Sequence, residues 1–185
     1  MSEISRSALF GKLNHLGYKA MESATVFCKL RGNPYVELVH WLQQILQLQD
    51  SDLHRIVRQF NLDSSHLAQE ITEALESLPR VSSSITDLSS NLEEATERGW
   101  LYGTLMFGDD QVRTGYLIVG MLKTHSLRNA LLHISPQFAK VGADSLTERF
   151  AEVVEGSPES GQHASDGFRL GAAAPGEASQ AMAPA

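Results

Sequence analysis

Apolar residues recur every three or four positions through most of this chain, the spacing that collects them on one face of a helix. The first such stripe ends near Gly32 and consists of Leu13, Leu16, Ala20, Ala24 and Phe27. No run alternates apolar and polar residues for long enough to indicate a paired strand. The pattern therefore predicts an all-α fold without a substantial sheet.

Residues that favour helix ends place the boundaries of the first helices. Asn33-Pro34 combines a good cap with the residue favoured in a first helical turn, which predicts a second helix from this point. Its apolar positions are Val36, Val39, Leu42, Ile45 and Leu46. Ser51 and Ser64 are predicted to cap a short third and a fourth helix, and Pro79 closes the fourth. Four helices thus fill the first half of the chain.

The second half repeats this order. It begins at Ser90, which has the spacing of a capping box with Glu93. Residues 36–46 align with residues 112–122 at an offset of 76 positions, 112 minus 36. Farther along, the apolar positions of the fourth helix align with three in the second half: Leu67, Ile71 and Leu75 with Leu146, Phe150 and Val154. We predict two pseudo-duplicated four-helix repeats; the alternative is that any two four-helix stretches share some apolar positions.

The ends of the chain differ from the repeats. Residues 4–13 predict a short extra helix, whose apolar residues either cap the core or form one wall of a groove for a partner's amphipathic helix. From Ser157 onward Ala, Gly, Ser and Pro dominate, and such a segment buries too little apolar surface to offset the entropy of ordering it. We place the domain at residues 1–159 and predict a flexible linker or tail at 160–185.

Charge and composition exclude several classes of partner. The formal net charge is -7 and the Lys and Arg residues are scattered, so no basic stripe follows a phosphate backbone and we expect no nucleic acid. No run approaches the roughly 18 apolar residues of a membrane span, so we expect no membrane partner. The N-terminus lacks the apolar run of a signal peptide, and the single Cys28 cannot form an intrachain disulfide. We expect a cytoplasmic protein.

The sequence offers no convergent catalytic or metal-binding constellation. No two of the seven histidines have the helical spacing that brings both to one metal, so we expect no metal site. His40 lies on the apolar second helix and is predicted to be a hydrogen-bonded core histidine. Cys28 has no neighbouring group arranged to activate a thiolate and is predicted to pack as a small hydrophobe.

Among known functional motifs, the sequence comes nearest to a phosphate-binding loop but does not match its spacing. Gly115 and Gly120 have the required separation, but Met121 and Leu122 stand between the second glycine and Lys123. In such a loop the lysine follows the glycine directly so that its ammonium joins the backbone donors on the phosphates. The intervening residues are typical of a buried helix, so we predict that the glycines allow close helix packing. We therefore expect no catalytic residues and no ATP site in this chain.

Four runs of residues resemble the N-terminal domain of the ClpV family of AAA+ unfoldases, which act in type VI secretion. They are Leu9 to Asn14, Tyr18 to Thr25, Phe27 to Trp41 and Gly103 to Leu117. The resemblance covers residues 4–159 and implies a Clp N-domain of two repeats with an added N-terminal helix. It also implies that ATP and Mg²⁺ bind in ATPase rings that these residues lack, in a parent that forms a homohexamer. The isolated domain is then expected to be a monomer.

The resemblance implies a protein-recognition role. In that family the added helix and the first repeat helix form a hydrophobic groove for an N-terminal helix of the larger contractile sheath subunit, and the rings disassemble the sheath. We expect the groove at Ile4, Leu9, Phe10, Leu13, Phe27, Cys28, Ile85 and Leu88. One alternative is an adaptor- or substrate-binding domain of a general Clp chaperone or protease unfoldase, which the added helix would distinguish. A third hypothesis, an enzyme of unrecognised fold, is disfavoured by the lack of a polar constellation.

Overall fold

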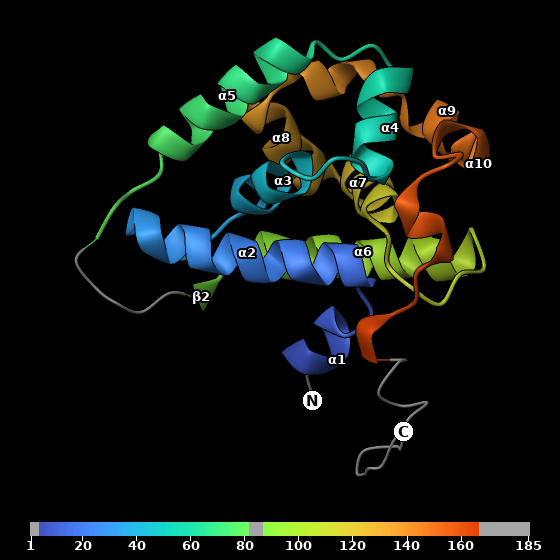
Figure 1. The fold of residues 1–185 in the computed structure, drawn as a ribbon, viewed down its shortest axis with the longest axis horizontal. Coiled ribbons are helices and arrows are strands. Elements are labelled where there is room, and N and C mark those ends of the chain that lie inside the picture. The colour runs from blue at the N-terminus through green and yellow to red at the C-terminus, as the bar shows by residue number, and fades with distance from the viewer. Residues whose placement is uncertain (1–3, 82–86, 167–185) are drawn as a thin grey trace.

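The computed structural model describes residues 4–81 and 87–166, and their regular secondary structure is almost entirely helical (Figure 1). Ahead of the first repeat lies α1 (Arg6–Phe10), and the first repeat itself contains α2 (His15–Arg31), β1 (Tyr35–Val36), α3 (Leu38–Leu46), α4 (Asp52–Gln59) and α5 (Ser64–Glu76). The second contains β2 (Asp87–Leu88), α6 (Ser90–Leu105), α7 (Thr114–Leu122), α8 (His125–Ile134), η1 (Pro136–Lys140), α9 (Ala143–Glu148), α10 (Phe150–Val153) and η2 (Pro158–Gly161). The predicted all-α fold is confirmed.

Several helix ends lie where the sequence placed them. Gly32 ends α2 in the left-handed conformation at φ 74°, and the Ser51 hydroxyl caps α4 by accepting the His54 N–H. Two other caps were predicted one residue late, because Asp63 rather than Ser64 caps α5 and Ser89 rather than Ser90 precedes α6.

The largest boundary error concerns Asn33-Pro34. The helix that these residues were predicted to start begins only at Leu38, because Tyr35–Val36 pairs in parallel with Asp87–Leu88. This pairing joins segments about fifty residues apart, which local cap signals do not report. Among the described residues it is the whole of the sheet structure apart from isolated bridges.

The duplication is present in three dimensions. The two apolar helices α3 and α7 each contain 9 residues and begin 76 positions apart, at 38 and 114. All six apolar residues aligned between the closing helices are buried. The described chain has ten α-helices rather than eight, because α1 precedes the repeats and the last helix is divided into α9 and α10.

The two repeats exchange backbone pairings. Leu88, just before α6, pairs in parallel with Val36, just before α3. Leu13, just before α2, pairs in parallel with Val112, just before α7. In each case the segment that leads into the first helix of one repeat lies against the segment that leads into the second helix of the other. The repeats are therefore interlocked rather than merely stacked.

The central contact of this arrangement lies between α6 and α7. A Cβ atom at Gly120 would lie 2.9 Å from the carbonyl carbon of Arg98 and 3.0 Å from the nitrogen of Gly99, so only glycine allows this approach. Every residue of α7 is buried. The prediction that the glycines of this segment allow close helix packing is confirmed at Gly120.

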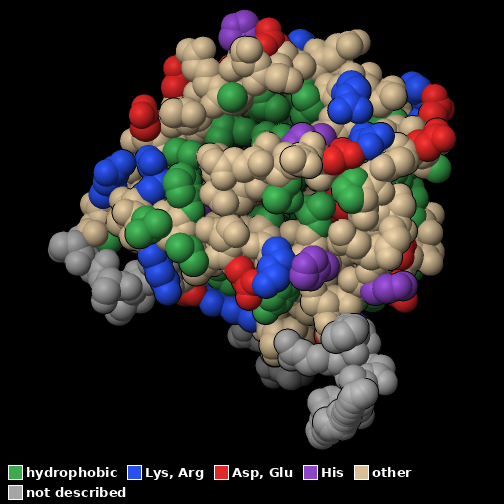
Figure 2. Space-filling view, viewed as in Figure 1, with side chains coloured by type: hydrophobic (Ala, Val, Ile, Leu, Met, Phe, Trp, Pro, Cys, Tyr) green, Lys and Arg blue, Asp and Glu red, His purple; other side chains and the backbone are tan. Residues whose placement is uncertain are grey.

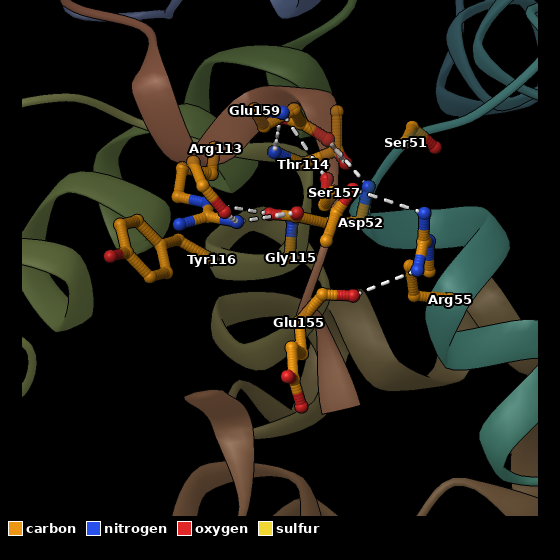
Figure 3. Close-up of polar contacts among 12 residues, drawn as sticks. Ser51, Asp52, Arg55, Arg113, Thr114, Gly115, Tyr116, Glu155, Ser157 and Glu159 are labelled. Carbon is orange, nitrogen blue, oxygen red and sulfur yellow. Dashed lines mark hydrogen bonds and ion pairs between the residues drawn. The ribbon is translucent and has the colours of Figure 1, made fainter. Parts of the chain in front are cut away.

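A buried polar network joins three helix starts (Figure 3). Arg113 donates to both carboxylate oxygens of Asp52, from Nε at 2.8 Å and from Nη2 at 2.7 Å. The Glu159 carboxylate has no exposed surface and accepts from the backbone N–H of Asp52 at 2.7 Å and of Thr114 at 2.8 Å. It also accepts from the Asn14 side-chain amide at 2.9 Å. These donors stand at the starts of α4, α7 and α2, respectively.

Burial affects the protonation of this carboxylate. Desolvation, together with the nearby Asp52 charge, raises the pKa of Glu159 to about 6. That value still lies below neutral pH, so Glu159 is mainly a carboxylate there and can accept from all of these donors.

His40 and Cys28 have the structural roles that were predicted. His40 is fully buried; its Nδ1 accepts from the Glu37 N–H, and its Nε2 lies 3.0 Å from the Asn33 side-chain oxygen. Burial and the Arg31 charge lower the pKa of His40 to about 4, so the ring is neutral at pH 7. Cys28 is fully buried, and burial raises the pKa of its thiol.

The domain extends beyond the predicted boundary at residue 159. Residues 157–166 form a C-terminal strap that returns to the junction of α1 and α2. The N–H of Ser165 donates to the Leu13 carbonyl and that of Asp166 to the Gly11 carbonyl, each at 2.9 Å. The Gln162 side chain accepts from the Leu16 N–H, and Asp166 pairs with Lys12. The linker prediction is therefore wrong for residues 160–166, while residues 167–185, with Phe168 and Leu170, lie outside the described residues.

Replacing Glu159 with Gln should destabilise the domain. One of its two acceptor oxygens becomes an amide that faces other donors, so buried N–H groups lose a partner at a cost of about 2 kcal/mol. Thermal melting should show a Tm lower by roughly 4–8 °C for a domain of this size. Glu155→Gln, at an exposed carboxylate nearby, is the matched control and should melt like the wild type. An unchanged Tm for Glu159→Gln would contradict the role given to this carboxylate.

Removing residues 160–185 should also lower the melting temperature. The truncation deletes the hydrogen bonds from Ser165 and Asp166 to the α1–α2 junction, and we expect a loss of about 1–2 kcal/mol, or roughly 2–8 °C in Tm. A chain that ends at Asp166 retains all of these contacts and serves as the control. Equal melting temperatures for the two truncated chains would show that the strap contributes nothing to stability.

Candidate partner-binding groove

The candidate site is an apolar groove between the N-terminal segment and α6. Its volume is about 380 Å³. The N-terminal wall consists of Ile4, Ala8, Leu9 and Lys12, and the wall on α6 consists of Glu97, Arg98, Trp100 and Leu101. Ile4 and Leu101 are 66% and 39% exposed, and neighbouring exposed apolar side chains, unlike single scattered ones, are typical of a binding surface. The groove therefore presents apolar surface that nothing in the described chain covers.

The apolar surface continues along α6 beyond the groove. Leu105 follows Leu101 by one helical turn and is 78% exposed, and Met106 next to it is also exposed. Residues four apart on a helix lie on the same face, so Leu101 and Leu105 extend one stripe. A partner helix with its own apolar stripe fits a surface of this form.

Ion pairs hold α1 against α6. Arg6 pairs with Asp87 and with Glu93, each at 2.6 Å, and the Asp87 pair holds the pKa of that carboxyl below its usual range. At the other end, the Lys12 ammonium lies 5.2 Å from the centre of the Trp100 ring and pairs with Asp166 at 3.2 Å. Glu93, predicted as part of a capping box, thus serves instead as an anchor for α1.

The strap reaches this wall because of Gly11. A Cβ atom at this position would lie 2.7 Å from the Ser7 carbonyl oxygen and 3.0 Å from Cβ of Asp166. A larger residue would therefore push the strap away from α1.

The structure brings together some of the predicted groove residues and separates others. Ile4 and Leu9 line the groove. Phe10, Leu13 and Cys28 are not among the residues that line this groove: Phe10 packs in the core, and Leu13 and Cys28 have no exposed surface. Phe27 packs edge-on against the His40 ring, with centroids 6.1 Å apart, and thus faces α3 rather than α1.

Two of the predicted groove residues remain, Leu88 and Ile85. Leu88 is half-buried against the core within β2, and Ile85 lies outside the described residues. Sequence reasoning missed Trp100, Leu101 and Leu105, although a signal was present: α6 carries these apolar residues in addition to its buried stripe at Leu92, Ala95, Gly99 and Gly103. Apolar residues outside the core-facing stripe of an amphipathic helix indicate a second contact.

Residues 4–81 and 87–166 contain no group of three or more His, Cys, Asp or Glu side chains that could hold a metal ion. Within the same ranges, no helix has the length and hydropathy to cross a membrane.

Removing the Arg6 anchor should loosen α1. Arg6→Ala deletes both ion pairs, so the amide hydrogens of Leu9 and Gly11, which donate within and just after α1, should exchange about three- to tenfold faster. Arg128→Ala, an exposed cation outside the ion pairs of the described residues, is the control. Since the Asp87 pKa is lowered, the anchor should persist from pH 7 down to the ordinary aspartate range and be lost as the pH falls through the lowered value. Unchanged exchange in Arg6→Ala would contradict the anchoring role.

Comparison with known proteins relates the chain to a defined family. Residues 12–133 match the family model of the Clp repeat N-terminal domain. Over 184 residues the chain is 70% identical to the AAA+ ATPase ClpV1 of Pseudomonas aeruginosa. All of this chain is covered by that match but only 20% of the relative, so the chain spans about a fifth of the curated relatives it matches.

Solved structures share the fold. One, from work on the coevolution of the ATPase ClpV, the TssB-TssC sheath and the accessory HsiE protein, has a TM-score of 0.84 at 70% identity. That match covers 86% of this chain and 98% of the other. A complex of a ClpV N-domain with a VipB peptide has a TM-score of 0.75 at 22% identity and covers 86% of this chain and 98% of that chain. At this lower identity the likeness concerns the fold alone.

Proposed function

The chain belongs to the Clp repeat N-terminal domain family, and from this membership we propose that it recognises the contractile sheath of type VI secretion. Its ligand is an N-terminal amphipathic helix of the larger sheath subunit, and its site is the groove between α1 and α6. Binding brings the sheath to ATPase rings elsewhere in the parent protein, which then disassemble it.

One observation carries this proposal: an open apolar groove with an added helix, α1, as one wall. A helix docks by laying an apolar stripe into such a groove, with anchors one turn apart, and Leu101 and Leu105 are themselves one turn apart. The fold's likeness to a ClpV N-domain bound to a VipB peptide supports a peptide as the ligand. The identity of 70% with a ClpV1 ATPase supports type VI secretion as the setting.

The remaining properties of the parent are part of the same proposal. ATP and Mg²⁺ act only in the rings, this chain has no catalytic residue or cofactor of its own, and the parent is a cytoplasmic homohexamer. The isolated domain is a monomer that binds neither nucleic acid nor membrane. The net charge of -7 supports the absence of binding to polyanions.

A peptide titration tests the proposal. A synthetic peptide of the sheath subunit's N-terminal helix should bind with a Kd on the order of micromolar, about 8 kcal/mol, because the peptide loses conformational freedom on docking. Ile4→Glu and Leu101→Glu should each weaken binding at least about tenfold, since each replaces apolar surface that the ligand's stripe would cover with a carboxylate that docking would have to desolvate. Both residues are exposed, so the fold should survive, whereas a charge at Leu9 or Phe10 would mainly test the core.

Leu48→Glu is the matched control for these variants, because Leu48 is an exposed leucine that does not line the groove. Calorimetric titration and thermal melting are measured together. Wild-type affinity in folded Ile4→Glu and Leu101→Glu would place the site elsewhere, and a peptide without measurable affinity for the wild type would contradict the proposed ligand.

A further inference from the structure

A second exposed apolar surface lies at the C-terminal end of α2. Val26 and Leu30 are 58% and 82% exposed and stand one turn apart on the same face of this helix. Val81 lies beside them, because its N–H donates to the Gly32 carbonyl at 2.9 Å, and it is exposed as well. Figure 2 shows hydrophobic and Lys or Arg side chains gathered together over this end of α2. We call Val26, Leu30 and Val81, with the cations described next, the α2-end surface.

Three cations border these apolar side chains. Lys29 and Arg31 belong to the last turn of α2, and Arg80 precedes Val81. None of the three forms an ion pair with a carboxylate of the described residues, whereas Arg6, Lys12 and Arg55 all do. A local excess of positive charge therefore stands on a chain whose net charge is -7.

The Arg31 guanidinium is positioned before any partner arrives. It lies 5.5 Å from the centre of the Phe27 ring. An arginine held over a ring loses less freedom when it pairs with a carboxylate.

Helix stability explains only part of this surface. Cations in a last helical turn interact favourably with the partial negative charge there, which accounts for Lys29 and Arg31. It does not account for Arg80, which lies outside the helix, or for leucine and valine side chains left in water beside them.

We propose that the α2-end surface binds an acidic segment of a partner protein in which carboxylates flank one or two apolar side chains. Burial of Val26, Leu30 and Val81 supplies the attraction, and Lys29, Arg31 and Arg80 select carboxylates. A long polyanion, such as nucleic acid or an anionic membrane, would also meet the negative remainder of the domain, so a short acidic segment fits better.

This surface is separate from the groove. The groove is built from the N-terminal segment and α6, whereas the α2-end surface is built from α2 and the segment after α5. No residue is shared, so the two sites can be tested one at a time.

The test uses two synthetic peptides of about 15 residues, long enough to form a helix on binding. In one, glutamates flank a leucine stripe; in the other, lysines replace the glutamates. With isotopically labelled protein, the acidic peptide should shift the amide signals of residues 26–32 and of Arg80 and Val81 in a saturable manner. Raising the salt from about 50 to about 300 mM should weaken binding severalfold because exposed charges are screened.

Variants identify the residues responsible. The double variant Leu30→Ser with Arg80→Ala should weaken binding at least about tenfold, while Arg128→Ala and the groove variant Ile4→Glu should bind like the wild type. All of these side chains are exposed, and melting curves verify that each variant folds.

Three outcomes would overturn the proposal. The first is equal binding of the lysine peptide, and the second is absence of saturable shifts at residues 26–32 and at Arg80 and Val81 with the acidic peptide. The third is Arg80-dependent sedimentation with phosphatidylserine vesicles without peptide binding, which would make the surface a membrane contact.

Discussion

The Glu159 carboxylate is the contact on which the arrangement of the helices depends. The first backbone N–H groups of a helix have no partner within that helix, and the helix dipole makes its start partially positive. Here the starts of α4 and α7 donate directly to one buried carboxylate, and the cap residue of α2, Asn14, donates through its side chain. Three helix starts thus share one anion. Arg113 and Asp52 neutralise each other beside it through two hydrogen bonds, so no buried charge in the cluster lacks a partner (Figure 3).

The position of the groove depends on these hydrogen bonds to Glu159. The first wall, α1, is joined to α2 by only four residues, 11–14, and Leu13 among them pairs with Val112 just before α7. The second wall, α6, is held to α7 by the glycine contact at Gly120. Contacts with α7 therefore set the positions of both walls, and Glu159 binds the start of α7. Exposed apolar residues in the groove keep their geometry because buried polar groups elsewhere set the positions of the helices that carry them.

The parts of the fold that could be predicted from sequence are those decided by local patterns. A continuous buried face fixes α2, α3 and α7, and the offset of 76 residues between the last two follows from their apolar positions alone. The failures involve distant partners. Asn33-Pro34 has the local signature of a helix start, but the chain there pairs with Asp87–Leu88. The strap has the small, polar composition of a linker, yet its order comes from hydrogen bonds to the carbonyls of Gly11 and Leu13, which composition does not report.

Only one wall of the groove could be predicted, because the other wall also depends on contacts between distant parts of the sequence. The sequence indicates an added helix with apolar residues, and Ile4 and Leu9 do line a groove. It does not indicate which helix forms the opposite wall, because that depends on the ion pairs of Arg6 with residues more than eighty positions away. Phe27 was assigned there from its place on the first repeat helix, whereas its side chain points to His40 and α3. Helical spacing shows which apolar residues share a face of the helix, but only the packed structure shows which neighbouring helix that face contacts.

The strap also links the groove to the place where the chain leaves the described fold. Lys12 lines the groove, lies over Trp100 on the opposite wall, and pairs with Asp166 at the end of the strap. The Gly11 carbonyl next to it accepts the Asp166 N–H. Lys12 therefore contacts both the opposite wall of the groove and the end of the strap, so a ligand that moved α1 away from α6 would also move a residue that pairs with the strap. These contacts are few and partly exposed, whereas the hydrogen bonds to Glu159 are buried. We therefore expect α1 to shift more readily than the helices of the two repeats when a ligand binds.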